Sequence, residues 1–224
     1  MSIRTDMAAE SFSQAGGAEK LQGVKVKNKV IENARLKVTD ITIETQKAAE
    51  KLGRPVGRYI TLTATDSTFD MYSDSFRERA EVIAKAIGEL CGGCERFLAV
   101  GLGNYALTSD AVGPLTAEKI FATRHIKSLA KELDTDNLGE VTVIQPGVLG
   151  NTGIESSEQV KAIAERVTPQ AVIAVDALAC SELSNLGRTI QLCNTGISPG
   201  SGVENARKEL SLSTLGVKCI AIGV

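Results

Sequence analysis

The chain has 224 residues, of which 43% are hydrophobic and 23% charged, as in an ordinary globular protein. Its net charge is -2 and aromatic residues make up only 4%, which excludes a basic field or a base-stacking platform for nucleic acid. No stretch approaches the ~20 apolar residues of a membrane helix, and the N-terminus has no apolar signal-peptide core, so we expect a cytoplasmic protein that binds neither nucleic acid nor a membrane.

The first third of the chain divides into a leader and a β-rich region. Residues 1–23 show no sustained periodicity, so we expect a mobile leader there. Residues 24–66 are rich in β-forming residues, and 36–43 and 59–63 alternate apolar with polar side chains, as half-exposed strands do. This pattern predicts a small N-terminal β region at an edge of the sheet or in a small subdomain.

The rest of the chain alternates helical spacing with short apolar runs. The spacing predicts helices over about 73–91, 111–131 and 156–167. The apolar runs predict strands over 97–101, 141–144, 171–175, 189–193 and 217–224. This alternation implies right-handed βαβ units, hence one α/β domain over residues 24–224. We expect three layers, with helices on both faces of a mostly parallel central sheet.

A glycine turn follows the strand at 97–101. It reads Gly101-Leu102-Gly103-Asn104 and leads to Thr108-Ser109-Asp110, just before a helical pattern. Asp110 is a good helix N-cap residue, and capping alone is the simpler interpretation of the pattern. It is also a candidate catalytic carboxylate, because ligands of α/β folds sit just past the carboxyl ends of the strands.

A second carboxylate, Asp176, follows the apolar run 171–175 directly. A buried carboxylate is costly and needs a partner, which could be a loop amide or a functional group. Asp110 and Asp176 would emerge at the same edge of the sheet. Two neighbouring carboxylates do not both ionise freely, so one could act as a base on water while the other supplies a proton.

Two further patterns are open or weak. The Gly-rich loop 195–202 has many amides that could face an anion or an oxyanion, but it could equally be a plain flexible loop. A C-x-x-C pair supplies two of the four ligands of a typical zinc site, and the chain has one such pair, Cys91-Gly92-Gly93-Cys94. The sequence offers no obvious second pair, because the other cysteines are scattered and His125 is the only histidine. We therefore expect no metal and no cofactor.

Several collinear stretches together resemble the germination protease (spore protease) family. They comprise Gly101-Leu102-Gly103-Asn104 with Thr108, Asp110, Gly113 and Pro114; Thr123-Arg124-His125; Pro146-Gly147-Val148 through Thr152-Gly153-Ile154-Glu155; Val172 through Ala179; and Thr195-Gly196-Ile197 with Pro199 through Val203 and Arg207-Lys208. The resemblance runs from about residue 4 to residue 224, and motifs in a fixed order are more specific than any single one.

The resemblance implies an atypical aspartic endopeptidase with Asp110 and Asp176 as its catalytic pair. Such enzymes degrade small acid-soluble spore proteins during germination, in the forespore or spore core, and are made as zymogens that work as homotetramers. Their fold is similar to that of the hydrogenase-maturation endopeptidases. Candidate substrate-binding or oxyanion residues are Gly103, Asn104, Arg124, Gly196, Gly200, Ser201, Arg207 and Lys208. Of these, the three basic residues are candidates for reading the acidic residue before the cut.

The family cuts after an acidic residue and before an apolar residue followed by Ala. Asp6-Met7-Ala8 fits this as a self-processing site, with the cut between Asp6 and Met7, although Ile3 stands where the family favours an acidic residue. Ser198 and Glu204 depart from the His and Gly of the family's Gly-rich loop.

The chain ends at Val224, where the family continues, so the family's C-terminal portion is expected to be lacking. This makes an inactive scaffold or binding homologue an open alternative. A metal-dependent peptidase of the hydrogenase-maturation type is the alternative enzyme.

Overall fold

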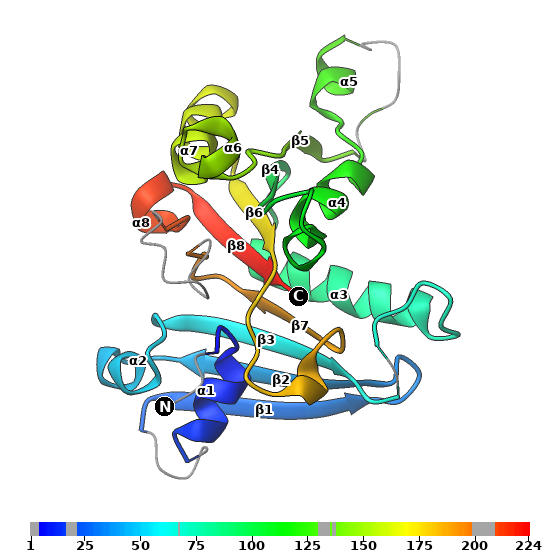
Figure 1. Cartoon of the computed structure of the whole chain (residues 1–224), viewed down its shortest axis with the longest axis vertical. Helices are drawn as coiled ribbons and strands as arrows, with labels where there is room; N and C mark the ends of the chain where they lie inside the picture. The colour runs from blue at the N-terminus through cyan, green and yellow to red at the C-terminus, as the bar shows by residue number, and fades with distance from the viewer. Residues whose placement is uncertain (1–4, 17–21, 67, 130–134, 136–137, 199–208) are drawn as a thin grey trace.

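An eight-stranded sheet forms the middle of the computed structural model, in the order β1-β2-β3-β7-β8-β6-β4-β5 (Figure 1). The structure describes residues 5–16, 22–66, 68–129, 135, 138–198 and 209–224. The strands are β1 (Val24–Ile31), β2 (Leu36–Ile43), β3 (Gly57–Ala64), β4 (Arg96–Gly101), β5 (Glu140–Ile144), β6 (Ala171–Asp176), β7 (Thr189–Cys193) and β8 (Lys218–Gly223).

The sheet is parallel in one half and antiparallel in the other. Strands β5, β4, β6 and β8 run parallel, whereas β1, β2, β3 and β7 pair antiparallel with their neighbours. The reversal at β7 arises because the chain leaves β6 at its carboxyl end and re-enters the sheet from the same edge, without a helix crossing the sheet. The α/β class is confirmed, and the N-terminal β region is an edge of the same sheet.

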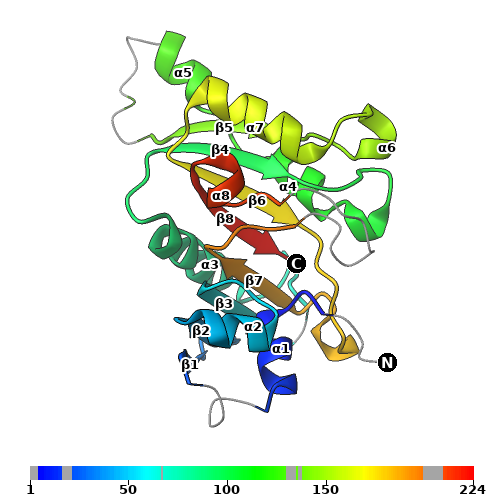
Figure 2. The ribbon, with the colours of Figure 1, turned by 90° about the vertical axis from the view of Figure 1, so that its left-hand side faces the viewer.

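Helices cover both faces, as predicted (Figures 1 and 2). Helices α1 (Ala8–Gln14), α2 (Gln46–Leu52) and α7 (Ser156–Val167) pack on one face. Helix α3 (Phe76–Cys91) packs on the other face, where α4 (Val112–Lys119) also lies, with Ala117 close to Gly101. Neighbouring strand residues alternate between these layers: Tyr59 joins the cluster under α1 and α2, and Ile60 joins the cluster under α3.

The remaining elements are short. They are α5 (Arg124–Leu129), α6 (Leu149–Thr152), α8 (Leu212–Leu215) and the 3₁₀ turns η2 (Thr108–Asp110) and η3 (Leu183–Asn185). None of the helices in the described part of the chain has the length and apolar character to cross a bilayer.

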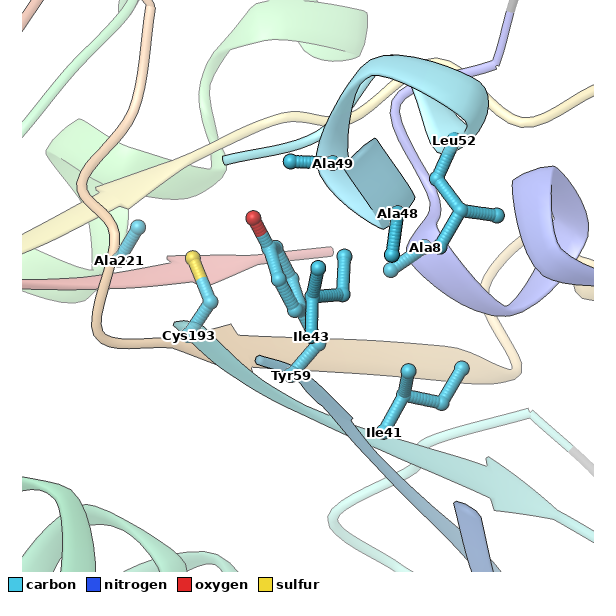
Figure 3. Packing of buried hydrophobic residues seen from close by; sticks show 9 residues of the cluster. All are labelled: Ala8, Ile41, Ile43, Ala48, Ala49, Leu52, Tyr59, Cys193 and Ala221. Atoms are coloured by element: carbon cyan, nitrogen blue, oxygen red, sulfur yellow. The ribbon is translucent and has the colours of Figure 1, made fainter. Parts of the chain in front are cut away.

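The prediction of a mobile leader is wrong for residues 5–15. Residues 8–14 form helix α1, and Asp6, Met7 and Ala8 before and at its start are buried. Figure 3 shows why a short helix without strong sequence periodicity is held there: Ala8 lies in one apolar cluster with residues of α2 and β2, including Leu52 and Ile43. Tertiary packing, rather than local propensity, stabilises a helix of this length.

The single helix predicted over 111–131 is interrupted. Helix α4 ends before Ile120, which is extended, and α5 begins at Arg124. Between them Thr123 bonds to the β5 region: its amide donates to the Val141 carbonyl at 3.0 Å, and its hydroxyl donates to the Gly139 carbonyl at 2.6 Å. Residues 120–123 therefore run beside β5 as an extended segment, and 130–131 lie outside the described residues.

A buried arginine ties α3 to the β2 and β3 ends of the sheet. Arg79 is only 2% exposed. Its guanidinium donates to the Ala34 carbonyl at 3.1 Å and forms a short ion pair with Asp66, and it lies 5.5 Å from the centroid of the Phe69 ring. A charge this deeply buried depends on such partners.

We expect Arg79→Leu to lower the free energy of unfolding by about 3–5 kcal/mol, because it removes the hydrogen bond to the Ala34 carbonyl and the ion pair with Asp66. Urea denaturation followed by circular dichroism measures the loss. Arg77→Leu is the matched control: Arg77 pairs with Glu81 on the exposed side of the same helix, so its loss should cost less than about 0.5 kcal/mol. Equal losses for the two variants would contradict a structural role for the buried guanidinium.

Candidate active site

At the carboxyl ends of β4 and β6, three pieces of main chain are in direct contact. Gly101 pairs with Val175 in the ladder, and the Leu102 amide donates to the Val175 carbonyl at 2.8 Å. A side chain at Gly113, in α4, would lie 2.1 Å from the Leu102 carbonyl oxygen and 2.5 Å from that of Val175. This close main-chain contact brings the turn after β4 against the end of β6.

Asp110 closes that turn and does not cap α4. Its carboxylate accepts the Asn104 amide at 2.8 Å, and its carbonyl accepts the same amide at 3.1 Å. The N-cap of α4 is Ala111, without a side-chain hydrogen bond. Gly103 has φ +113°, and a side chain there would lie 2.1 Å from the Asp110 carbonyl oxygen. Capping as the interpretation of Asp110 is therefore wrong, and Gly103 and Asn104 hold Asp110 in place.

Asp176 ends β6 and is 5% exposed. One of its carboxylate oxygens accepts the Ala177 amide at 2.9 Å. By alternation along β6 its side chain belongs to the face of Val172 and Ala174, under α7. The structure thus brings Asp110 and Asp176 to the same edge of the sheet: Asp110 lies in η2, after β4, and Asp176 ends the adjoining parallel strand β6.

Asp176 begins a row of residues across three strands. It pairs with Gly223 of β8, and Gly223 pairs with Gln191 of β7. Two strand spacings put Gln191 about 10 Å from Asp176 along the row. Gly223 leaves room for the Leu178 side chain, which a Cβ at position 223 would approach to 2.1 Å.

The segment just before α1 is bound at this row. The Gln191 side chain, 6% exposed, accepts the Ala8 amide at 2.6 Å and donates to the Asp6 carbonyl at 3.2 Å. Asp6 also pairs with Ala179: its amide donates to the Ala179 carbonyl at 2.8 Å, and its carboxylate accepts the Ala179 amide at 3.2 Å. Arg54 donates to the Thr5 carbonyl at 2.6 Å. Residues 5–8 are thus held through main chain and side chain.

Glu10 anchors α1 to the segment after β6. Its carboxylate accepts the Ser181 hydroxyl and the Asn185 side-chain amide, each at 2.6 Å. Burial alone would raise the pKa of Glu10, but hydrogen bonds from Ser181, Thr5 and Asn185 outweigh burial and lower the pKa from 4.5 to about 2. Glu10 is therefore a charged, structural carboxylate.

A groove of about 280 Å³ runs beside the bound segment. Asp6, Arg54 and Leu178 line it, together with Gly196 and Ser198 of the Gly-rich loop. Gly196 has φ +89°, and a side chain there would lie 2.0 Å from the Leu210 carbonyl oxygen. Of the predicted Gly-rich loop, the described part therefore faces the groove that holds Asp6.

The other predicted site residues lie elsewhere or outside the description. Arg124 pairs with Glu140, which sits opposite Arg96 at the amino ends of β4 and β5, so the structure does not bring Arg124 to the aspartates. Gly200, Ser201, Arg207, Lys208 and Glu204 lie outside the described residues. Within the described part of the chain, no three His, Cys, Asp or Glu side chains are grouped to hold a metal ion.

Sequence reasoning missed Gln191, Arg54 and the Ala179 main chain as ligands of the leader. Gln191 had a detectable signal, because it is an uncharged polar residue in the middle of the buried strand Thr189–Cys193. A buried carboxamide needs hydrogen-bond partners, but its partners here lie more than 180 residues away in sequence.

The lowered pKa of Glu10 predicts how the docking of α1 depends on pH. A depressed pKa contributes stability above the unfolded value of 4.5, and that contribution is lost as the pH falls through about 2. Wild type should therefore exceed Glu10→Gln in stability at neutral pH, and the difference should shrink between pH 4.5 and pH 2. Urea unfolding and hydrogen exchange of residues 8–14 measure this. A stability difference between wild type and Glu10→Gln that does not change with pH would contradict the role of Glu10 as a charged anchor. The control is Glu50→Gln, at an exposed site on α2.

Comparison with known proteins gives one consistent result. The family model described as germination protease matches residues 3–224. A germination protease of Clostridium perfringens is 39% identical over 228 residues, covering 99% of this chain and 69% of that protein. One of Clostridium tetani is 40% identical (100% and 70% covered), and one of Caldanaerobacter subterraneus subsp. tengcongensis is 41% identical (100% and 68% covered).

Among solved structures, a NiFe hydrogenase maturation protease, HycI, from Thermococcus kodakarensis KOD1 matches with a TM-score of 0.37 and 20% identity, covering 62% of this chain and 78% of that one. The family model and the curated relatives each extend over nearly the whole sequence. The chain therefore belongs to the germination protease family, a family of peptidases.

Proposed function

We propose that this protein is a self-processing endopeptidase that degrades small acid-soluble spore proteins during germination, inside the spore. Family membership supports the protease activity and the spore context. One observation carries the proposed mechanism: Asp110 and Asp176 follow adjoining parallel strands whose ends are joined by the hydrogen bond from Leu102 to Val175. The carboxyl edge of such a sheet is where α/β enzymes place reacting groups.

In this proposal the two aspartates share the work of an acid and a base. The ionised carboxylate takes a proton from a water molecule, which attacks the carbonyl carbon of the scissile peptide. The protonated carboxyl donates its proton to the peptide nitrogen as the C–N bond breaks, so the second product leaves as a neutral amine.

The preferred substrate bond is proposed to follow an acidic residue and precede an apolar residue and Ala. The chain's own Asp6-Met7-Ala8 has this pattern, and its position at the same edge of the sheet as Asp176 supports self-processing between Asp6 and Met7. The assembly proposed for the active enzyme is a homotetramer, which sedimentation of the purified chain would test.

Asp110→Asn and Asp176→Asn should each lower kcat on a Glu-Ile-Ala peptide by at least about 100-fold, because each removes one partner of the acid–base pair. A fluorogenic peptide assay measures the rate. Asp74→Asn, at an exposed position before α3, is the matched control and should cleave normally. A pair variant that retained wild-type activity would rule out that aspartate as an acid or base. Activity that EDTA abolishes would favour the metal-dependent alternative.

Self-processing predicts a new N-terminus. Incubated wild-type protein should yield a chain that begins at Met7, as measured by intact-mass spectrometry, whereas Asp176→Asn protein should keep its original start. Mixing the Asp176→Asn chain with wild type distinguishes cutting within one molecule from cutting between molecules. Active protein that retains an intact residue 1 would contradict processing as the route to activity.

A further inference from the structure

We propose that the site occupied by residues 5–8, beside this groove, is the binding site for substrate peptides, and that Gln191 and the Ala179 main chain are its recognition elements. The peptide that fits is an extended chain with an acidic residue, then an apolar residue, then a small one. This inference rests on the proposed peptidase function for the identity of the peptide as a substrate. The leader occupies the site as a ligand supplied by the chain itself.

Gln191 binds the main chain on both sides of one residue. Its carboxamide oxygen accepts from the Ala8 amide, and its nitrogen donates to the Asp6 carbonyl. A carboxamide is the side chain that can serve both a peptide donor and a peptide acceptor at once. These two hydrogen bonds involve only the main chain of the peptide. Gln191 would therefore position any extended peptide in the way in which it positions residues 6–8, whatever its side chains.

The main chain of Ala179 binds the acidic residue of the peptide. Its carbonyl accepts the amide of Asp6 and its amide donates to the Asp6 carboxylate, so the main chain of the segment after β6 pairs with the bound peptide. A carboxylate that accepts a main-chain amide is bound more strongly than a neutral acceptor of the same shape. The acidic preference therefore has a source in a peptide amide, that of Ala179, three residues after Asp176.

The two following residues meet apolar surroundings. Met7 is 4% exposed and borders a cavity of about 180 Å³ that Leu178, Leu186 and Val224 also line, so a larger apolar side chain has room there. Ala8 is 3% exposed and packs in the cluster with Leu52 and Ile43 (Figure 3), which leaves no space for a larger residue. An acid–apolar–small order follows from these three environments.

The row across the sheet connects this groove to the aspartates. Gln191 and Asp176 flank Gly223 on the same level of the ladder, and Leu178 lies over Gly223 between them. Leu178 lines both the groove beside Asp6 and the cavity beside Met7.

The test measures binding separately from cleavage. The receptor is the full chain with Asp176→Asn, to stop cleavage, and Met7→Asp, to expel the leader by placing a charge in an apolar site. The probe is a fluorescent peptide with the sequence of residues 5–10, followed by fluorescence anisotropy. Gln191→Ala in this receptor should weaken binding about tenfold, because two hydrogen bonds are lost. Gln46→Ala, at an exposed site on α2, is the matched control and should leave binding unchanged.

Changing the probe tests the two side-chain contacts. Replacing its Asp by Asn should weaken binding several-fold, and replacing its Met by Lys should abolish it. Normal binding to the Gln191→Ala receptor, or no binding to a receptor with a native unfolding midpoint, would overturn the proposal. If Met7→Asp prevents folding, Asp6→Lys empties the groove instead. Cleavage of the probe by the Asp176→Asn receptor would contradict only the Asp-pair mechanism, whereas normal cleavage of the peptide by Gln191→Ala protein would overturn only the binding site.

Discussion

The contact on which this site depends is the one between main chains at Gly113. Helix α4 approaches the turn after β4 and the end of β6 so closely that a side chain at position 113 would lie 2.1 Å from the Leu102 carbonyl oxygen. The same approach puts Gly101 against the Gly113 carbonyl. Because three pieces of backbone touch, the turn that carries Asp110 has little freedom relative to the strand that carries Asp176.

The reversed direction of β7 adds the second half of the site. A strand parallel to β8 would carry its first residues at the amino edge of the sheet, far from Asp176. Running antiparallel, β7 begins at the carboxyl edge and places Gln191 level with Gly223 and Asp176. The excursion over residues 177–188, which makes this reversal possible, also supplies Ala179, Ser181 and Asn185 to hold the leader and α1.

The sequence predicted what depends on local patterns. Short apolar runs indicated β4 and β6 correctly, and with them the common edge for Asp110 and Asp176. The break between α4 and α5 was not predictable, because Thr123 bonds to Val141, a residue that local periodicity does not include. Arg124 was chosen for its charge, but charge carries no information on which edge of the sheet a residue occupies. The leader helix was missed since its stability comes from contacts with distant strands.

The contacts of the leader divide unequally at the Asp6–Met7 bond. Before that bond lie the contacts of Thr5 with Arg54 and of Asp6 with Ala179, together with one hydrogen bond of Gln191. After it lie the other hydrogen bond of Gln191, the burial of Ala8 and the anchoring carboxylate of Glu10. A cut at this bond would place the contacts of Thr5 and Asp6 on a separate peptide, no longer linked to α1 through the chain.

The second piece would keep its apolar packing and its charged anchor as part of the folded chain. Release of the first piece would therefore not require α1 to undock. Departure of residues 5 and 6 would expose the Ala179 amide and the Gln191 side-chain nitrogen, the two donors that hold Asp6. The reaction would in this way free the part of the site that binds the acidic residue, while Met7 and Ala8 remain at the start of α1.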